Sequence, residues 1–119
     1  MKMRCFYFCV LLLLSFLVVG RAYAVKHTTV SAVYNVNGVC DQCKKRIETA
    51  AYIKGVRYAE WNVETHDLTL KYNSDKTSVD EILKSVAKAG HDSALFKATD
   101  EDYDKLPACC RYRSGIKMK

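Results

Sequence analysis

Two of the chain's six cysteines stand where they could act together. Cys40 and Cys43 lie three residues apart in "NVNGVCDQCKKRIETAA" (35–51), where an alternating segment gives way to a helical pattern. Thiols at a helix start have lowered pKa values, because the unpaired N–H groups and the helix dipole favour the thiolate. Two thiolates without oxygen or imidazole ligands suit Cu(I) or Hg(II) ahead of Zn(II), which prefers four ligands. We therefore interpret Cys40 and Cys43 as a soft-metal site.

Two other uses of this cysteine pair remain open. A thiol–disulfide redox protein uses the same Cys-x-x-Cys arrangement at a helix start, although the flanking residues are not thioredoxin-like and the only proline is Pro107. A structural disulfide is the other alternative, but closing so short a loop stabilises a chain little. No His, Asp and Ser constellation supports acid–base or serine chemistry, so we expect a binding protein and not an enzyme.

The first 24 residues have the features of an export signal. Lys2 and Arg4 precede an apolar run over 5–20, and Ala22-Tyr23-Ala24 has the small-x-small form of a cleavage site. An apolar run of about 16 residues is short against the roughly 20 that span a bilayer. We expect residues 1–24 to be removed near Ala24, giving a periplasmic or secreted mature chain that does not span the membrane.

The charge of the remaining 95 residues is mild. Without the three basic residues of the signal (Lys2, Arg4 and Arg21), the 19 Lys and Arg become 16, against 13 Asp and Glu. This excess is too small to indicate a nucleic-acid partner. A chain of this length fits one small domain.

Alternation and helical periodicity follow one another along this domain. The expected elements are a strand over 29–37, a helix from Asp41 towards Gly55, a hairpin over 57–73, a helix from Val79 to Gly90 capped by Ser78 and Glu81, and a short strand at about 94–97. Two amphipathic helices of this kind bury their apolar stripes against one face of a sheet. The order therefore predicts an α+β, ferredoxin-like βαββαβ sandwich, with a four-stranded antiparallel sheet and both helices on one face.

These motifs resemble a known family. "GVCDQC" (38–43), the following "RIE" (46–48), "SVDEILKSVAKAGHD" (78–92) and the βαββαβ order are similar to the heavy-metal-associated domain of copper chaperones, P-type metal ATPases and the periplasmic mercury-binding protein. The resemblance covers residues 28–98. It implies that Cys40 and Cys43 hold the metal ion and that a metal-transporting ATPase or another metal-transfer protein is the partner. The family's usual methionine before the first cysteine is missing, and Val39 is a candidate to fill its space.

The three histidines are expected to have different roles. The loop after the second helix supplies, in this family, a side chain that tunes the metal's charge or access, and His91 occupies that loop. His91 is therefore a candidate third ligand or tuning residue, with a capping or packing role as the alternative. We expect His27 to be solvated and His66 to be a polar residue of the hairpin turn.

Residues 99–119 form an extension beyond the family domain. Thr99 is a suitable N-cap for a short helix over "DEDYDKL", and Pro107 would end it. A fourth strand would carry the chain away from the Cys40–Cys43 loop, so the extension would have to reach back. Cys109 and Cys110 are candidate additional thiolate ligands, which would widen the metal range to Zn(II) or Cd(II), or a resolving redox pair. A thiol pair remote from the loop is the alternative.

Overall fold

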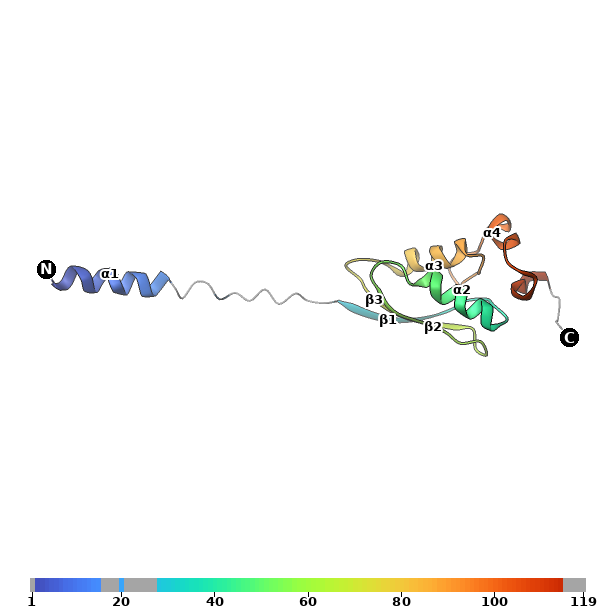
Figure 1. Ribbon diagram of the computed structural model, residues 1–119, viewed down its shortest axis with the longest axis horizontal. Helices are drawn as coiled ribbons and strands as arrows, with labels where there is room; N and C mark the ends of the chain where they lie inside the picture. Colours follow the sequence, from blue (N-terminus) through green and yellow to red (C-terminus); the bar gives the residue numbers. More distant parts are fainter. Residues whose placement is uncertain (1, 16–19, 21–27, 115–119) are drawn as a thin grey trace.

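The computed structural model describes residues 2–15, 20 and 28–114 (Figure 1). Its first element, α1 (Lys2–Ser15), lies within the predicted export signal. The predicted cleavage site at residues 22–24 and His27 lie outside the described residues. Among the described helices, none has the length and apolarity needed to cross a membrane.

A three-stranded antiparallel sheet forms the base of the domain. Its strands are β1 (Thr29–Asn35), β2 (Val56–Trp61) and β3 (Asp67–Asn73), in the order β1-β3-β2. The register pairs Thr29 with Asn73 and Asn35 with Asp67, so the end of β1 lies beside the β2–β3 turn. The predicted first strand and hairpin are confirmed. Because β1 runs directly into the Cys40–Cys43 loop, this end of the sheet positions the cysteines.

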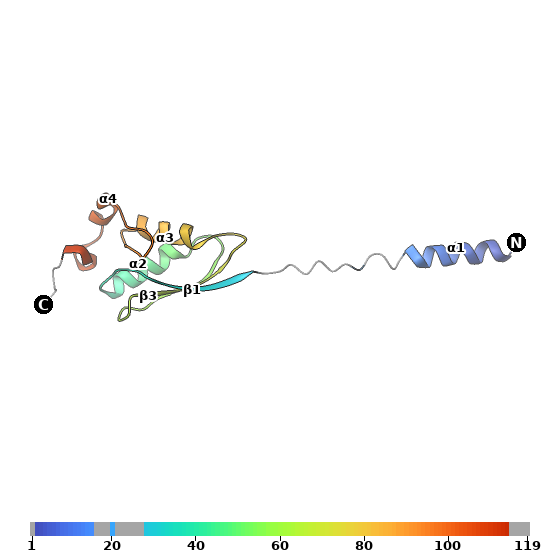
Figure 2. The same ribbon diagram turned by 180° about the vertical axis from the view of Figure 1, so that it is seen from behind.

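Two helices cover one face of this sheet, as predicted (Figures 1 and 2). They are α2 (Asp41–Ala51) and α3 (Val79–Lys88). The backbone N–H of Glu81 donates to the Ser78 hydroxyl, which confirms the predicted N-cap of α3. The helices bury Ile47, Ile82, Leu83 and Val86 against Leu68, Leu70 and Trp61 of the sheet.

The predicted fourth strand at 94–97 does not form. Val36 and Ser93 make an isolated antiparallel bridge, after which the chain reverses. The Ser93 N–H donates to the Phe96 carbonyl over 2.8 Å, and the Asp92 carboxylate accepts from the Ala98 N–H over 2.7 Å. These bonds close a turn that competes with strand pairing along β1. The prediction of a four-stranded sheet is therefore wrong for the part of the chain that the structure describes.

This early reversal changes where the extension begins. Its elements are α4 (Asp100–Asp104) and the 3₁₀ turns η2 (Ala108–Cys110) and η3 (Tyr112–Ser114). The Thr99 hydroxyl accepts from the Asp102 N–H over 3.1 Å, which confirms the predicted start of the short helix. Since the chain never travels to the far end of the sheet, the extension starts close to the cysteine loop, and η2 packs against α2.

Candidate metal centre

Three thiols from two distant segments meet at the start of α2. The Sγ of Cys40 lies 3.4 Å from that of Cys43 and 3.5 Å from that of Cys110. All three sulfurs lie within 4.8 Å of one another. Cys109 is beside them, with its Sγ 3.5 Å from that of Cys110. The structure therefore brings the predicted Cys40–Cys43 pair and the C-terminal cysteines together.

The sheet and α2 fix the first two thiols. Cys40 is the N-cap of α2 with an extended backbone (φ −149°), and Cys43 is buried in the first turn. Beneath the loop, a Cβ at Gly38 would lie 3.0 Å from the Trp61 ring, so a side chain at this position would clash. The Trp61 Nε1–H in turn donates to the Val36 carbonyl over 2.9 Å. The indole thus supports the loop from below.

Trp61, and not Val39, lies under the cysteine loop. The side chain of Val39 is 50% exposed, whereas Trp61 is fully buried. The expectation that Val39 fills the space beneath the loop is therefore wrong.

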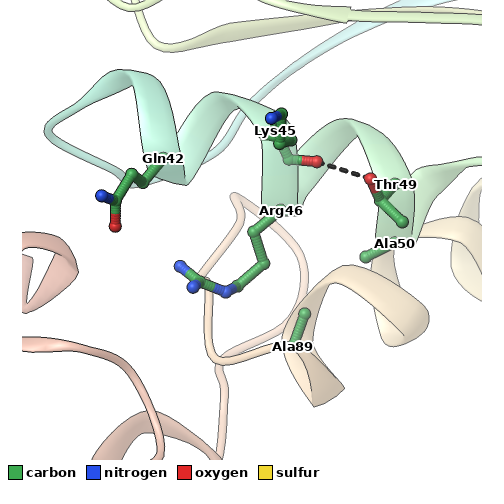
Figure 3. A pocket seen from close by; sticks show the side chains of 6 residues that line it. All are labelled: Gln42, Lys45, Arg46, Thr49, Ala50 and Ala89. Atoms are coloured by element: carbon green, nitrogen blue, oxygen red, sulfur yellow. Dashed lines mark hydrogen bonds between the residues drawn. The ribbon is translucent and has the colours of Figure 1, made fainter.

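Cys110 is positioned by the turn that follows Pro107. Its N–H donates to the Pro107 carbonyl over 2.9 Å, and its side chain is fully buried. Two side chains of α2 meet the C-terminal thiols. Arg46 Nη1 donates to Cys110 Sγ over 3.2 Å, and the Cys109 thiol donates to Gln42 Oε1 over 3.0 Å. Figure 3 shows Gln42 and Arg46 beside the open groove that Lys45, Thr49, Ala50 and Ala89 also line.

The thiols differ in how readily they ionise. Burial opposes ionisation of Cys40, but hydrogen bonds from the Cys43 backbone and thiol and from the Cys110 thiol outweigh it and lower the pKa of Cys40. Burial raises the pKa of Cys110 to about 11. The hydrogen bond with Cys110 likewise raises the pKa of Cys109 to about 11. Of these three thiols, Cys40 therefore ionises most readily.

His91 packs near the loop but lies outside the thiol cluster. It is fully buried, its Nδ1 is 2.8 Å from the Asn37 carbonyl, and its ring stacks on Tyr112 with centroids 5.7 Å apart. Because a carbonyl only accepts, Nδ1 carries the proton. Burial lowers the pKa of His91, so the ring is neutral at pH 7. Its Nε2 is buried without a hydrogen-bond partner among the described residues. The structure thus favours the packing alternative for His91.

His66 lies in the β2–β3 turn, as predicted. Its backbone is in the left-handed region (φ 64°), and its ring stacks on Trp61 at 5.4 Å.

The extension is held by its last aromatic and basic residues. The Tyr112 hydroxyl donates to the Gly90 carbonyl over 2.8 Å and accepts from the Asp92 N–H over 2.7 Å. Arg113 pairs with the Asp92 carboxylate at 2.6 Å and stacks over the Tyr103 ring. Sequence reasoning missed these anchors and Arg46. The one available signal was the spacing of "CCRYR" (109–113), in which basic and aromatic residues directly follow the cysteines.

Comparison with known proteins defines the class. The model of the heavy-metal-associated domain matches residues 33–92, which contain Cys40, Cys43 and His91. The chain therefore belongs to the heavy-metal-associated domain family. Cys109 and Cys110 lie beyond the matched residues.

Individual relatives agree with this assignment. The copper chaperone CopZ of Staphylococcus haemolyticus is 29% identical over 65 residues, which cover 53% of this chain and 96% of the chaperone. A copper-exporting P-type ATPase of Staphylococcus saprophyticus is 38% identical over 63 residues, 52% of this chain but only 8% of the ATPase. Among solved structures, oxidized MerP from Ralstonia metallidurans has a TM-score of 0.53 and 28% identity, covering 56% of this chain and 96% of MerP.

Proposed function

We propose that this protein binds one soft heavy-metal ion, Cu(I) or Hg(II), through Cys40 and Cys43, and acts as a metallochaperone or scavenger. The observation that carries the proposal is the 3.4 Å separation of the two sulfurs at the start of α2. The lowered pKa of Cys40 supplies a thiolate for the first metal–sulfur bond. The names of the relatives, which include a copper chaperone and MerP, support the class of ion.

Release of the ion proceeds by ligand exchange. Cys40 is partly exposed, so a thiolate of a docking protein can bond to the ion before the bond to Cys40 breaks. The partner is a metal-transporting ATPase or another metal-transfer protein, which the match to a copper-exporting ATPase supports. Lys45 and Arg46, which line the open groove on α2 (Figure 3), suit an acidic docking face. Arg46 also contacts the thiol cluster, because its Nη1 donates to Cys110 Sγ.

The site works outside the cytoplasm in this proposal. The basic start at Lys2 and Arg4, the apolar run and the Ala22-Tyr23-Ala24 motif support export and cleavage near Ala24. The released chain is then periplasmic or secreted. Cell fractionation with mass spectrometry of the chain tests export and cleavage. Finding only the full-length form, with none of it exported, would contradict this part of the proposal.

A thiol–disulfide redox protein is the second candidate. It is favoured by the contacts among the four thiols of 3.4 to 3.5 Å, which allow exchange between neighbouring pairs. A measured reduction potential separates the two functions. A potential as oxidising as that of a disulfide donor, together with weak metal binding, would favour the redox function.

Metal titration of the reduced full chain tests the main proposal. Cys5 and Cys9 are exposed thiols on α1, so both are first changed to serine to remove binding outside the site. Titration of this background protein with Cu(I), Hg(II) and Zn(II) should give one tightly bound soft ion. Adding Cys40→Ser and Cys43→Ser should abolish that site while circular dichroism remains unchanged. Unchanged affinity after these two substitutions would disprove the assignment.

A further inference from the structure

We propose that Cys110 is a third ligand, so that the extension converts the two-thiolate loop of the family into a three-thiolate site selective for divalent soft ions. This inference rests on the proposed function of Cys40 and Cys43. It goes beyond that function, because the third sulfur comes from a segment outside the matched residues 33–92.

The positions of the sulfurs fit three-coordination. With a metal–sulfur bond of about 2.3 Å, three sulfurs around one ion lie about 4.0 Å apart, whereas two sulfurs on opposite sides of an ion lie about 4.6 Å apart. The Cys40 sulfur is 3.4 Å from that of Cys43 and 3.5 Å from that of Cys110, and the whole group fits within 4.8 Å. An ion with bonds of zinc's length would require these contacts to open by about half an ångström, and the longer bonds of Hg(II) and Cd(II) by somewhat more.

The charge around Cys110 favours a divalent ion. Three thiolates concentrate negative charge in a partly buried site, and Arg46 Nη1, 3.2 Å from Cys110 Sγ, offsets part of it. A divalent ion cancels the remainder, whereas Cu(I) leaves net negative charge in a region where charge is costly. Arg46 therefore belongs to the site as a charge partner and not as a ligand. Hg(II) and Cd(II) combine the divalent charge with a preference for thiolate.

Cys109 is not part of the ligand set. Its thiol donates to Gln42 Oε1 over 3.0 Å, and the ligand atoms that lie within 4.8 Å of one another are those of Cys40, Cys43 and Cys110. Cys109 thus provides a matched control, since it has the same chemistry one residue away.

The extension holds the third sulfur ready before the ion arrives. Tyr112 bridges Gly90 and Asp92, and Arg113 pairs with Asp92, so the residues just after Cys110 are tied to the domain. A ligand positioned in advance loses little conformational freedom on binding. Binding forms three metal–sulfur bonds. Any of the three ligand thiols that is still protonated releases its proton to water, and no oxidation state changes.

A Cd(II) competition titration tests the third ligand. It uses the reduced full chain with Cys5→Ser and Cys9→Ser, and compares Cys110→Ser, Cys110→Ala and Cys109→Ser against a chelator of known affinity. We expect either Cys110 substitution to weaken Cd(II) binding at least about tenfold and to reduce the thiolate-to-metal absorption by a third. Cu(I) binding should weaken less, and Cys109→Ser should change neither quantity.

The possible outcomes distinguish the proposed Cys40–Cys43 site from the proposed third ligand Cys110. Unchanged Cd(II) affinity and absorption in both Cys110 variants, with binding lost in Cys40→Ser/Cys43→Ser, would overturn the third ligand and leave the proposed function intact. An equal loss in Cys109→Ser and Cys110→Ser would overturn the assignment to Cys110. A background protein that binds no soft ion would overturn both proposals. Circular dichroism and Trp61 fluorescence verify folding, and agreement of the serine and alanine variants excludes an effect of the introduced hydroxyl.

Discussion

The Cys40–Cys43 loop and the C-terminal extension meet at the same site, but different contacts hold each of them in place. The loop is anchored in the core, between the end of β1 and α2 and above the fully buried Trp61. The extension carries Cys110 on a short 3₁₀ turn, and its last residues are tied to the domain largely by polar contacts. The loop is therefore expected to unfold only with the whole domain, whereas the extension can open locally at a lower free energy.

This difference assigns separate roles to the two regions. A loop fixed by the core provides a constant pair of ligands. The extension also buries Tyr103, Leu106 and Cys110, but its last residues are held largely by polar contacts, so it can add or withdraw its own ligand. This contrast predicts four effects, of which the loss of the buried indole of Trp61 should be the largest.

Trp61→Ala should destabilise the whole domain. Removing the buried ring leaves a cavity beneath Gly38 and frees the Val36 carbonyl, so the free energy of unfolding should fall by about 3–5 kcal/mol. Urea denaturation followed by circular dichroism measures the change. Val33→Ala, at an exposed position of β1, is the control and should cost little. A loss below about 1 kcal/mol for Trp61→Ala would show that the indole does not support the loop.

Arg113→Ala should open the extension and leave the domain folded. The substitution removes the pair with Asp92, the bond to the Ala98 carbonyl and the stacking on Tyr103. A partly buried pair of this kind contributes about 2 kcal/mol, which corresponds to roughly a thirtyfold rise in the labelling rate of Cys110 by a thiol reagent. Mass spectrometry of the labelled peptide measures the rate.

Lys105→Ala is the matched control for this experiment. The Lys105 side chain is largely exposed and its ion pair with Asp102 is 3.7 Å long, so the Cys110 labelling rate should not change. Equal labelling rates in Arg113→Ala and the unmodified chain would mean that Arg113 does not hold the extension.

Tyr112→Phe should have a smaller effect on the same opening. The ring still stacks on His91, but the bonds to the Gly90 carbonyl and the Asp92 N–H are lost. The free energy needed to open the extension should fall by about 1–2 kcal/mol, because the Asp92 N–H is left without its acceptor. Hydrogen exchange of the Asp92 amide should accelerate correspondingly, whereas Tyr52→Phe, at an exposed position, should leave it unchanged. Retained protection of this amide would contradict the role given to the Tyr112 hydroxyl.

Acid should weaken the Asp92–Arg113 anchor. Burial opposes ionisation of Asp92, but the Arg113 guanidinium and the Ala98 N–H outweigh it and hold the pKa of Asp92 below its ordinary value of 3.8. The folded state thus binds the proton less readily than the unfolded state. The stabilisation is complete above the ordinary pKa and is lost as the pH falls through the depressed value.

The free energy of unfolding, measured for the unmodified chain and for Asp92→Asn, checks this prediction. The difference between the two proteins should be largest near neutral pH and should shrink below about pH 4. A difference that is constant over this range would show that the Asp92 charge does not stabilise the extension.

The sequence predicted the regions where pattern and packing agree. Alternation in β1 and the hairpin, the Ser78 cap and the apolar stripe of α2 each identify their element from neighbouring residues. The proposed pair Cys40 and Cys43 could be located because two elements meet there. These signals come from neighbouring residues, so contacts between distant segments did not alter the elements that they predict.

The missed features depend on contacts between distant residues. The predicted fourth strand does not form, because the Asp92 carboxylate and the Ser93 N–H close a turn there instead. The hydrophobic periodicity of the sequence contains no sign of this turn. The same turn brings the extension near the loop. The meeting of Cys40 with a C-terminal cysteine, 70 positions apart, was a hypothesis from the sequence, but the sequence did not distinguish Cys110 from Cys109 or exclude a remote thiol pair.

The number of sulfurs around a bound Hg(II) ion tests most directly the claim that loop and extension form one site. X-ray absorption spectroscopy of the reduced full chain carrying Cys5→Ser and Cys9→Ser, loaded with one Hg(II), measures this number. We expect three sulfurs around the ion, and two after Cys110→Ser. Two sulfurs in both proteins would contradict it, because the ion would then be held by Cys40 and Cys43 alone.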